Sequence, residues 1–196
     1  QEPLTVELTV SFEGQVKRVV TATTVDRIVR VPIEMIMKGD LDPFRVWAPG
    51  SPNLYDLRVR LLKGGDALDQ VDTYFGMRKI ERRDGRIYLN NSPLYQKLIL
   101  DQGYWPDSNI TPPSDEAIRL DLQYILDFGY NGARKHQKLE DPRFYYWADK
   151  MGVLIWGEVP SPYDFTDETV RNLADTMFGF IERDFNHPSI ICWVPL

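Results

Sequence analysis

The stretch from residue 131 to residue 158, NGARKHQKLEDPRFYYWADKMGVLIWGE, decides the fold. Residues 131–136 are predicted to form a short strand. Asp141-Pro142 supplies an N-cap residue and a proline that is preset for the first helical turn, and Gly152 is the expected stop of that helix. The apolar run of residues 153–156 is the next predicted strand. Buried strands that alternate with helices are typical of a parallel sheet.

The same alternation extends in both directions from this stretch. We expect strands at residues 95–100 and 190–194, a helix that begins at Ser114-Asp115, and a third helix that begins at Thr166 or Asp167. Four parallel strands with three helices amount to the N-terminal half of a (β/α)₈ TIM barrel. A whole barrel needs roughly 250 residues, so we expect a truncated one.

A small open α/β sheet is the alternative architecture for this part of the chain. Such a sheet ordinarily carries a glycine-rich phosphate loop after its first strand. Here the first predicted strand is followed by Gln102-Gly103-Tyr104-Trp105, which is not a loop of that kind. The half-barrel is therefore favoured.

The amino-terminal part of the chain has a different period. Leu4, Val6, Leu8 and Val10 alternate with polar residues, and similar short runs recur up to about residue 75. Turn signals separate these runs, at Glu13-Gly14, Lys38-Gly39-Asp40, Pro49-Gly50-Ser51-Pro52 and Lys63-Gly64-Gly65-Asp66. The pattern predicts an immunoglobulin-like, all-β sandwich of about seven strands. We therefore expect three parts, with the sandwich at 1–76, a connecting segment at 77–92 and the first four βα units of a barrel at 93–196.

Composition excludes several classes of function. The net charge of -6 and the pI near 5.0 argue against nucleic acid or an anionic membrane as a partner, and no run of 18 apolar residues predicts a membrane span. The single cysteine, Cys192, excludes an internal disulfide and lies among apolar neighbours, so we expect an inert core residue. His136 and His187 have no second ligand at metal-binding spacing, and no metal or cofactor is predicted.

Four further stretches carry a resemblance to a known family. Residues 44–55 and 72–80 contain Trp-x-Pro-x-x-Pro-x-Leu-Tyr and Phe-Gly-x-Arg patterns, Asn131-Gly132-Ala133-Arg134 and Trp156-Gly157-Glu158-Val159-Pro160 end two predicted strands, and the chain closes on residues 186–196. In this order they resemble glycoside hydrolase family 2, the β-galactosidase and β-glucuronidase family. The first two are similar to the close of its immunoglobulin-like domain, and the others to its second, third and fourth barrel strands.

The resemblance implies a retaining β-glycosidase that hydrolyses O-glycosidic bonds of carbohydrates. In that family one Glu attacks the anomeric carbon and another serves as the general acid/base. The acid/base follows the fourth barrel strand and the nucleophile the seventh, so the acid/base Glu is expected just after Leu196 and this chain is expected to hold neither. We therefore expect a fragment that is inactive by itself and that self-associates through the exposed edges of its half-barrel. Residues 100–105 replace a His-rich loop of the best-known β-galactosidases, so galactose specificity is not implied.

Polar side chains at the ends of the predicted strands make the candidate sugar site. In a parallel barrel these ends carry the chemistry, while the strand bodies form packed core. Sugars require directed hydrogen-bonding groups together with an aromatic face. The predicted substrate-binding residues are Asp101, Trp105, Arg134, His136 and Glu158.

Plainer readings of the same residues stay open. Arg134 is also explained as an ion-pair partner of Glu158, and His136 as an ordinary histidine with satisfied hydrogen bonds. Asp101 and Glu158 could form a glycosidase pair of their own in a complete small α/β enzyme. Another alternative, from a different class, is a non-catalytic carbohydrate-binding or interaction module in which the sandwich is the functional part.

Overall fold

The computed structural model describes residues 2–36 and 44–195. It divides into two compact units, of which the first comprises Gln1–Arg45 and Asn53–Phe75 and the second Val46–Pro52 and Gly76–Leu196. The predicted turn at Lys38-Gly39-Asp40 lies outside the described residues. In the part of the chain that is described, no helix is both long and apolar enough to cross a membrane.

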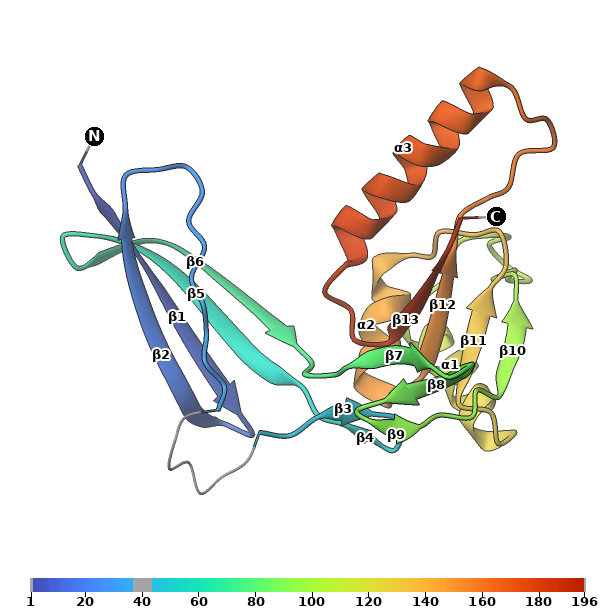
Figure 1. The fold of residues 1–196 in the computed structure, drawn as a ribbon, viewed down its shortest axis with the longest axis horizontal. Helices are drawn as coiled ribbons and strands as arrows, with labels where there is room; N and C mark the ends of the chain where they lie inside the picture. Colours follow the sequence, from blue (N-terminus) through green and yellow to red (C-terminus); the bar gives the residue numbers. More distant parts are fainter. Residues whose placement is uncertain (1, 37–43, 196) are drawn as a thin grey trace. The chain divides into compact units, whose positions relative to one another are not determined.

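The first unit is a four-stranded antiparallel sheet with the strand order β2-β1-β5-β6. Glu13-Gly14 and Gly64-Gly65 make its two tight hairpins, and all four residues have positive φ angles, the geometry that suits two-residue hairpin turns. These two turn predictions are confirmed (Figure 1). The strands are β1 (Leu4–Phe12), β2 (Gln15–Thr24), β5 (Tyr55–Lys63) and β6 (Asp66–Phe75).

The core of the first unit is small. Leu8, Val10 and Tyr55 are buried, and the Tyr55 ring stacks on that of Phe75 with the centroids 5.4 Å apart. The Arg18 guanidinium donates to backbone carbonyls in residues 31–36, so that segment is bonded to the sheet without forming a strand. The described residues of this unit therefore form one sheet, and the expected count of about seven strands in two sheets is not reached among them.

The second unit contains the parallel sheet that the sequence predicts. Its strand order is β10-β11-β12-β13, and each neighbouring pair is parallel. The strands are β10 (Leu98–Asp101), β11 (Gly132–Lys135), β12 (Leu154–Glu158) and β13 (Ile190–Val194), and the helices between them are α1 (Asp115–Asp127), α2 (Pro142–Met151) and α3 (Asp167–Asp184).

Local sequence signals explain where these helices begin and end. The side chains of Ser114, Asp141 and Thr166 each accept a hydrogen bond from a backbone N–H in the first turn of α1, α2 and α3. Gly152 ends α2 in the left-handed conformation, with φ of 75°. The predicted starts of all three helices are confirmed.

The three helices share one apolar core with the parallel sheet. Ile118 and Leu122 of α1 and Phe144 of α2 are fully buried with Ile155 of β12, and the helices lie on one side of the strands (Figure 1). A Cβ at Gly157 would lie 2.6 Å from the Phe180 ring of α3, so the missing side chain admits that ring to the core. The opposite face of the sheet is left free of helices.

Two small sheets also belong to the second unit. β3 (Trp47–Ala48) pairs with β4 (Ser51–Pro52), and β7 (Ile80–Arg83), β8 (Arg86–Leu89) and β9 (Ser92–Pro93) form a three-stranded sheet. Asp84 and Gly85, both with positive φ, make the turn between β7 and β8. The predicted connecting segment 77–92 thus contains an ordered sheet that the sequence analysis did not anticipate.

The strings that resemble family 2 meet around one buried carboxylate within the second unit. Asp149 accepts a hydrogen bond from the backbone N–H of Ser189 at 2.9 Å and pairs with Nδ1 of His187 at 2.5 Å. The Trp47 indole donates to the Asp149 carbonyl, and Arg78 donates to the carbonyl of Pro188. This explains why segments 46–52 and 76–80 belong with the parallel sheet, and it gives His187 a structural partner.

Candidate sugar-binding site

The carboxyl ends of the parallel strands bring polar side chains to one edge of the sheet. Arg134 lies level with Leu100 and Trp156 on the neighbouring strands. Side chains alternate between the faces of a strand, so Arg134 and Glu158 are on the open face. Asp101 and Lys135, which are level with each other, are on the face that the helices cover.

On the open face, three groups converge on the carboxylate of Glu158. Its side chain is 1% exposed, and its Oε2 accepts a hydrogen bond from Nε of Arg134 at 2.6 Å. Its Oε1 accepts from the backbone N–H of Gln137 at 3.0 Å and lies 3.1 Å from Nδ1 of His136. We call Arg134, His136, Gln137 and Glu158 the Glu158 cluster. It brings together three of the predicted site residues.

Electrostatics in the Glu158 cluster favour a charged carboxylate. Burial by itself would raise the pKa of Glu158, because it removes water from the ionised form. The hydrogen bonds from Arg134 and from the Gln137 backbone outweigh it, so the pKa lies below the ordinary value. The same contact raises the pKa of Arg134. The cluster therefore presents a fixed anion with a cationic side chain that is 39% exposed.

On the helix-covered side, a second group of charges is buried. Nζ of Lys135, 1% exposed, lies 2.6 Å from Oδ2 of Asp101 and 2.6 Å from Oε2 of Glu140. Lys138 pairs with the other oxygen of Glu140 and donates to the Gly103 carbonyl at 2.8 Å. We call Asp101, Gly103, Lys135, Lys138 and Glu140 the Lys135 network. It fixes the start of the loop after β10 against the loop after β11.

Asp121 of α1 adds a carboxyl group that faces the Lys135 network. Burial raises its pKa above the ordinary value of 3.8, and the charge of Asp101 raises it further, whereas Lys135 opposes the shift. The network therefore carries more acidic groups than its two lysines neutralise in comfort, and Asp121 is the group that responds.

The structure separates Asp101 from Glu158. Asp101 is held by Lys135 and by the backbone N–H of Gly103, on the covered side of the sheet. Glu158 is held by other partners on the open face. This arrangement argues against these two carboxylates acting together on one glycosidic bond.

Trp105 and Tyr104 exchange the positions that the sequence suggests for them. The backbone of Trp105 bridges to Asn109, and its indole nitrogen is buried. Trp105 is absent from the lining of the cavity described next, whereas Tyr104 lines it with 70% of its surface exposed.

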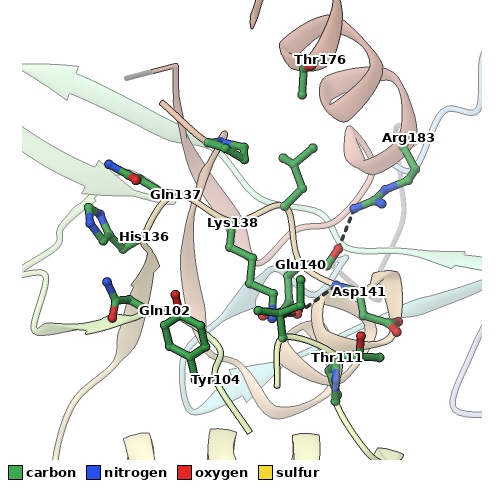
Figure 2. Close-up of a pocket in the computed structure, with 14 residues that line it drawn as sticks. Gln102, Tyr104, Thr111, His136, Gln137, Lys138, Glu140, Asp141, Thr176 and Arg183 are labelled. Carbon is green, nitrogen blue, oxygen red and sulfur yellow. Dashed lines mark hydrogen bonds and ion pairs between the residues drawn. The ribbon is translucent and has the colours of Figure 1, made fainter. Parts of the chain in front are cut away.

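A cavity of about 600 Å³ lies beside the Glu158 cluster (Figure 2). The loops after β10, β11 and β12 and the inner side of α3 enclose it. Gln102, His136 and Gln137 lie together at one end (Figure 2). His136 and Gln137 thus belong both to the cavity and to the Glu158 cluster. The remaining lining includes Tyr104, Ile110, Thr111, Lys138, Thr176 and Arg183.

Several residues of the site were missed by reasoning from sequence. Gln137 has φ of 53°, a left-handed conformation that is uncommon outside glycine and that aims its N–H at Glu158. No sequence pattern predicts that conformation. Lys135 was passed over because an alternating strand gives no sign of which lysine is buried. Tyr104 could have been found, since it precedes Trp105 in the same aromatic loop.

Comparisons with known proteins agree with this arrangement. The family model described as Glycosyl hydrolases family 2 matches residues 1–78. A putative β-glucuronidase of Formosa agariphila is 33% identical over 155 residues, which cover 76% of this chain and 18% of the relative. A β-galactosidase of Thermoanaerobacter pseudethanolicus is 29% identical over 178 residues, which cover 89% of this chain and 24% of the relative. The chain thus spans about a fifth to a quarter of the curated relatives' length.

Solved structures show the same fold. A β-glucuronidase of Parabacteroides merdae superposes with a TM-score of 0.81 over 98% of this chain and 24% of its own, at 18% identity. A β-glucuronidase of Ruminococcus gnavus, solved with D-glucaro 1,5-lactone, gives 0.81 over 100% of this chain and 32% of its own, at 21% identity. Together with the family match and the shared motifs, these findings place the sequence. The chain belongs to glycoside hydrolase family 2.

Proposed function

We propose that this chain forms part of a retaining β-glycosidase that acts on β-glucuronides or β-galactosides. In this proposal residues 1–76 contribute an immunoglobulin-like domain and residues 93–196 the first four βα units of the catalytic barrel. The curated relatives support it, because they carry β-glucuronidase and β-galactosidase names and are several times longer than the stretch they share with this chain.

The observation that carries the proposal is the Glu158 cluster. It lies at the carboxyl ends of neighbouring parallel strands, where barrel enzymes hold their active sites. A buried carboxylate clamped by Arg134, with His136 beside it, offers fixed donors and acceptors to sugar hydroxyls. Its role is to bind and orient the sugar, because orientation of the reacting groups supplies a large share of catalysis.

The bond-breaking carboxylates are proposed to lie elsewhere in the enzyme. Retaining hydrolysis needs a Glu or Asp nucleophile and a second carboxyl as acid/base, about 5–5.5 Å apart. Glu158 is committed to Arg134 and Gln137, and Asp101 to Lys135, so neither has the free approach that a nucleophile needs. The acid/base is expected just after Leu196.

The direct test is hydrolysis of aryl β-glucuronides and aryl β-galactosides. The 196-residue chain is expected to release no aryl group from either substrate, and a longer protein that continues through the remaining barrel strands is expected to release it from at least one. A longer protein that folds, with a cooperative melting transition, but hydrolyses neither substrate would contradict the proposal. Turnover by the 196-residue chain itself would contradict the placement of the carboxylates.

A further inference from the structure

We propose that the cavity beside the Glu158 cluster binds a second sugar unit of the substrate, stacked on Tyr104 and hydrogen-bonded by the side-chain amides of Gln102 and Gln137. The inference rests on the proposed glycosidase function and adds a substrate class to it. The enzyme would act on an oligosaccharide, or on a glycoside whose neighbouring unit is itself a sugar.

Size and continuity support a two-unit site. The volume of about 600 Å³ lies within the range of ordinary small-molecule sites and has room for one sugar ring with its hydroxyl groups. His136 and Gln137 line this cavity and also touch Glu158. A sugar bound at the Glu158 cluster and a second one in the cavity would therefore be next to each other, as in a linked pair.

The chemistry of the wall favours a neutral ligand rich in hydroxyls. Its charged groups are already paired, since Lys138 is bound to Glu140 and to the Gly103 carbonyl, and Arg183 to Asp184 and to the Glu140 carbonyl. In contrast, the amides of Gln102 and Gln137 make no side-chain hydrogen bond to any other described residue, as far as residues 2–36 and 44–195 show. Free amides each offer two donors and an acceptor, the groups that sugar hydroxyls pair with.

An exposed aromatic face completes this combination. Tyr104 is 70% exposed and stands in the cavity beside Gln102 (Figure 2). An exposed ring flanked by amides is suited to cover the C–H face of a sugar while its hydroxyls are bound at the edges.

The cavity is built from a rigid base, which lowers the cost of ordering it on binding. Gly103, between Gln102 and Tyr104, has φ of 66°, and its N–H donates to Asp101 while its carbonyl accepts from Lys138. A Cβ there would lie 2.6 Å from Nζ of Lys138. The Lys135 network therefore holds the backbone that carries both ligand-facing side chains.

The test is a binding titration of the 196-residue chain followed by its backbone amide NMR signals. The probes are lactose and cellobiose, two neutral β-linked disaccharides, with methyl β-galactoside as the one-unit control. We expect at least one disaccharide to shift the signals of residues 102, 104 and 137, and to do so at lower concentration than the one-unit control. Because binding is measured without turnover, this result is separate from the hydrolysis assay.

A pair of tyrosine variants makes the test specific. Tyr104→Ala is expected to weaken disaccharide binding about fivefold, the effect of uncovering about 40 Å² of apolar surface. Tyr130→Ala, which removes another exposed tyrosine outside the cavity lining, is expected to leave binding unchanged. The proposal is overturned if neither disaccharide shifts these signals, if methyl β-galactoside binds as tightly as the disaccharides, or if the two variants bind equally well.

Discussion

Nε of Arg134, on β11, donates a 2.6 Å hydrogen bond to the carboxylate of Glu158, on the neighbouring strand β12. The acceptor is 1% exposed and the donor 39% exposed, so a buried anion is neutralised by a cation that still reaches solvent. An unpaired carboxylate at that depth would be costly. The pair is therefore stable in the empty site and leaves part of the guanidinium available to a ligand.

Acid should weaken this pair in a way that one variant removes. The folded-state pKa of Glu158 lies below the ordinary value of 4.5, so its stabilising contribution is present above that pH and is lost as the pH falls through the lowered pKa. Between about pH 5 and pH 3 the wild type should lose more free energy of unfolding than Glu158→Gln does. Glu182→Gln, at an exposed position of α3, is the control and should follow the wild type.

Tryptophan fluorescence is the measurement that suits this comparison. All five tryptophans, at positions 47, 105, 147, 156 and 193, belong to the second unit, so urea unfolding followed by fluorescence reports on the unit that holds Glu158. At pH 7 Glu158→Gln should be less stable than the wild type by about 1–3 kcal/mol, since Arg134 and Gln137 lose a charged acceptor. Parallel acid profiles for the wild type and Glu158→Gln would contradict the pairing.

Asp121 should respond to pH in the opposite direction. Its folded-state pKa is raised above 3.8 by burial and by Asp101, so the folded state prefers the protonated form. That contribution is present below pH 3.8 and is lost as the pH rises through the raised pKa. Asp121→Asn should therefore be more stable than the wild type at pH 7, with the difference disappearing in acid.

The same unfolding assay checks this prediction, with Asp107→Asn in an exposed loop as the matched control. A constant difference between Asp121→Asn and the wild type at every pH would point to packing instead of charge, and would contradict the role given to the Lys135 network.

Two glycines separate backbone strain from crowding. Gly103 and Gly129 both have positive φ, 66° and 80°, so a methyl group is strained at either position. Only at Gly103 would a Cβ also collide, at 2.6 Å from Lys138 and 2.7 Å from Glu140, whereas at Gly129 it meets nothing within 4 Å. Gly129→Ala should cost about 1 kcal/mol, and Gly103→Ala distinctly more. Equal losses of stability in the two variants would show that the Lys135 network yields to a methyl group.

Sequence patterns predicted the parallel sheet because its signals are local. The Asp141-Pro142 start and the Gly152 stop of α2 depend only on neighbouring residues, and the structure confirms them. The turn at Asp84-Gly85 carried a signal of the same kind, an Asp-Gly pair between apolar residues, so the hairpin of β7 and β8 could have been predicted.

The candidate site was only partly within reach of the sequence. Arg134, His136 and Glu158 were grouped correctly because each ends a strand of one parallel sheet. Asp101 was grouped with them, although the register places it level with Lys135 on the other face. The left-handed backbone of Gln137 and the burial of Lys135 depend on contacts between loops that no periodicity records.

The central claim is that the Glu158 cluster binds and orients the sugar of a glycosidase. Its most direct measurement is kcat/KM for an aryl β-glucuronide or β-galactoside in the longer protein, together with the melting temperature. Arg134→Ala and Glu158→Gln should each lower kcat/KM by about a hundredfold while the protein stays folded, because misplacement of the sugar by about 1 Å is enough to cause such a loss; Glu182→Gln should leave it unchanged. Wild-type turnover by both cluster variants, or turnover by the 196-residue chain that Asp101→Asn abolishes, would contradict the account.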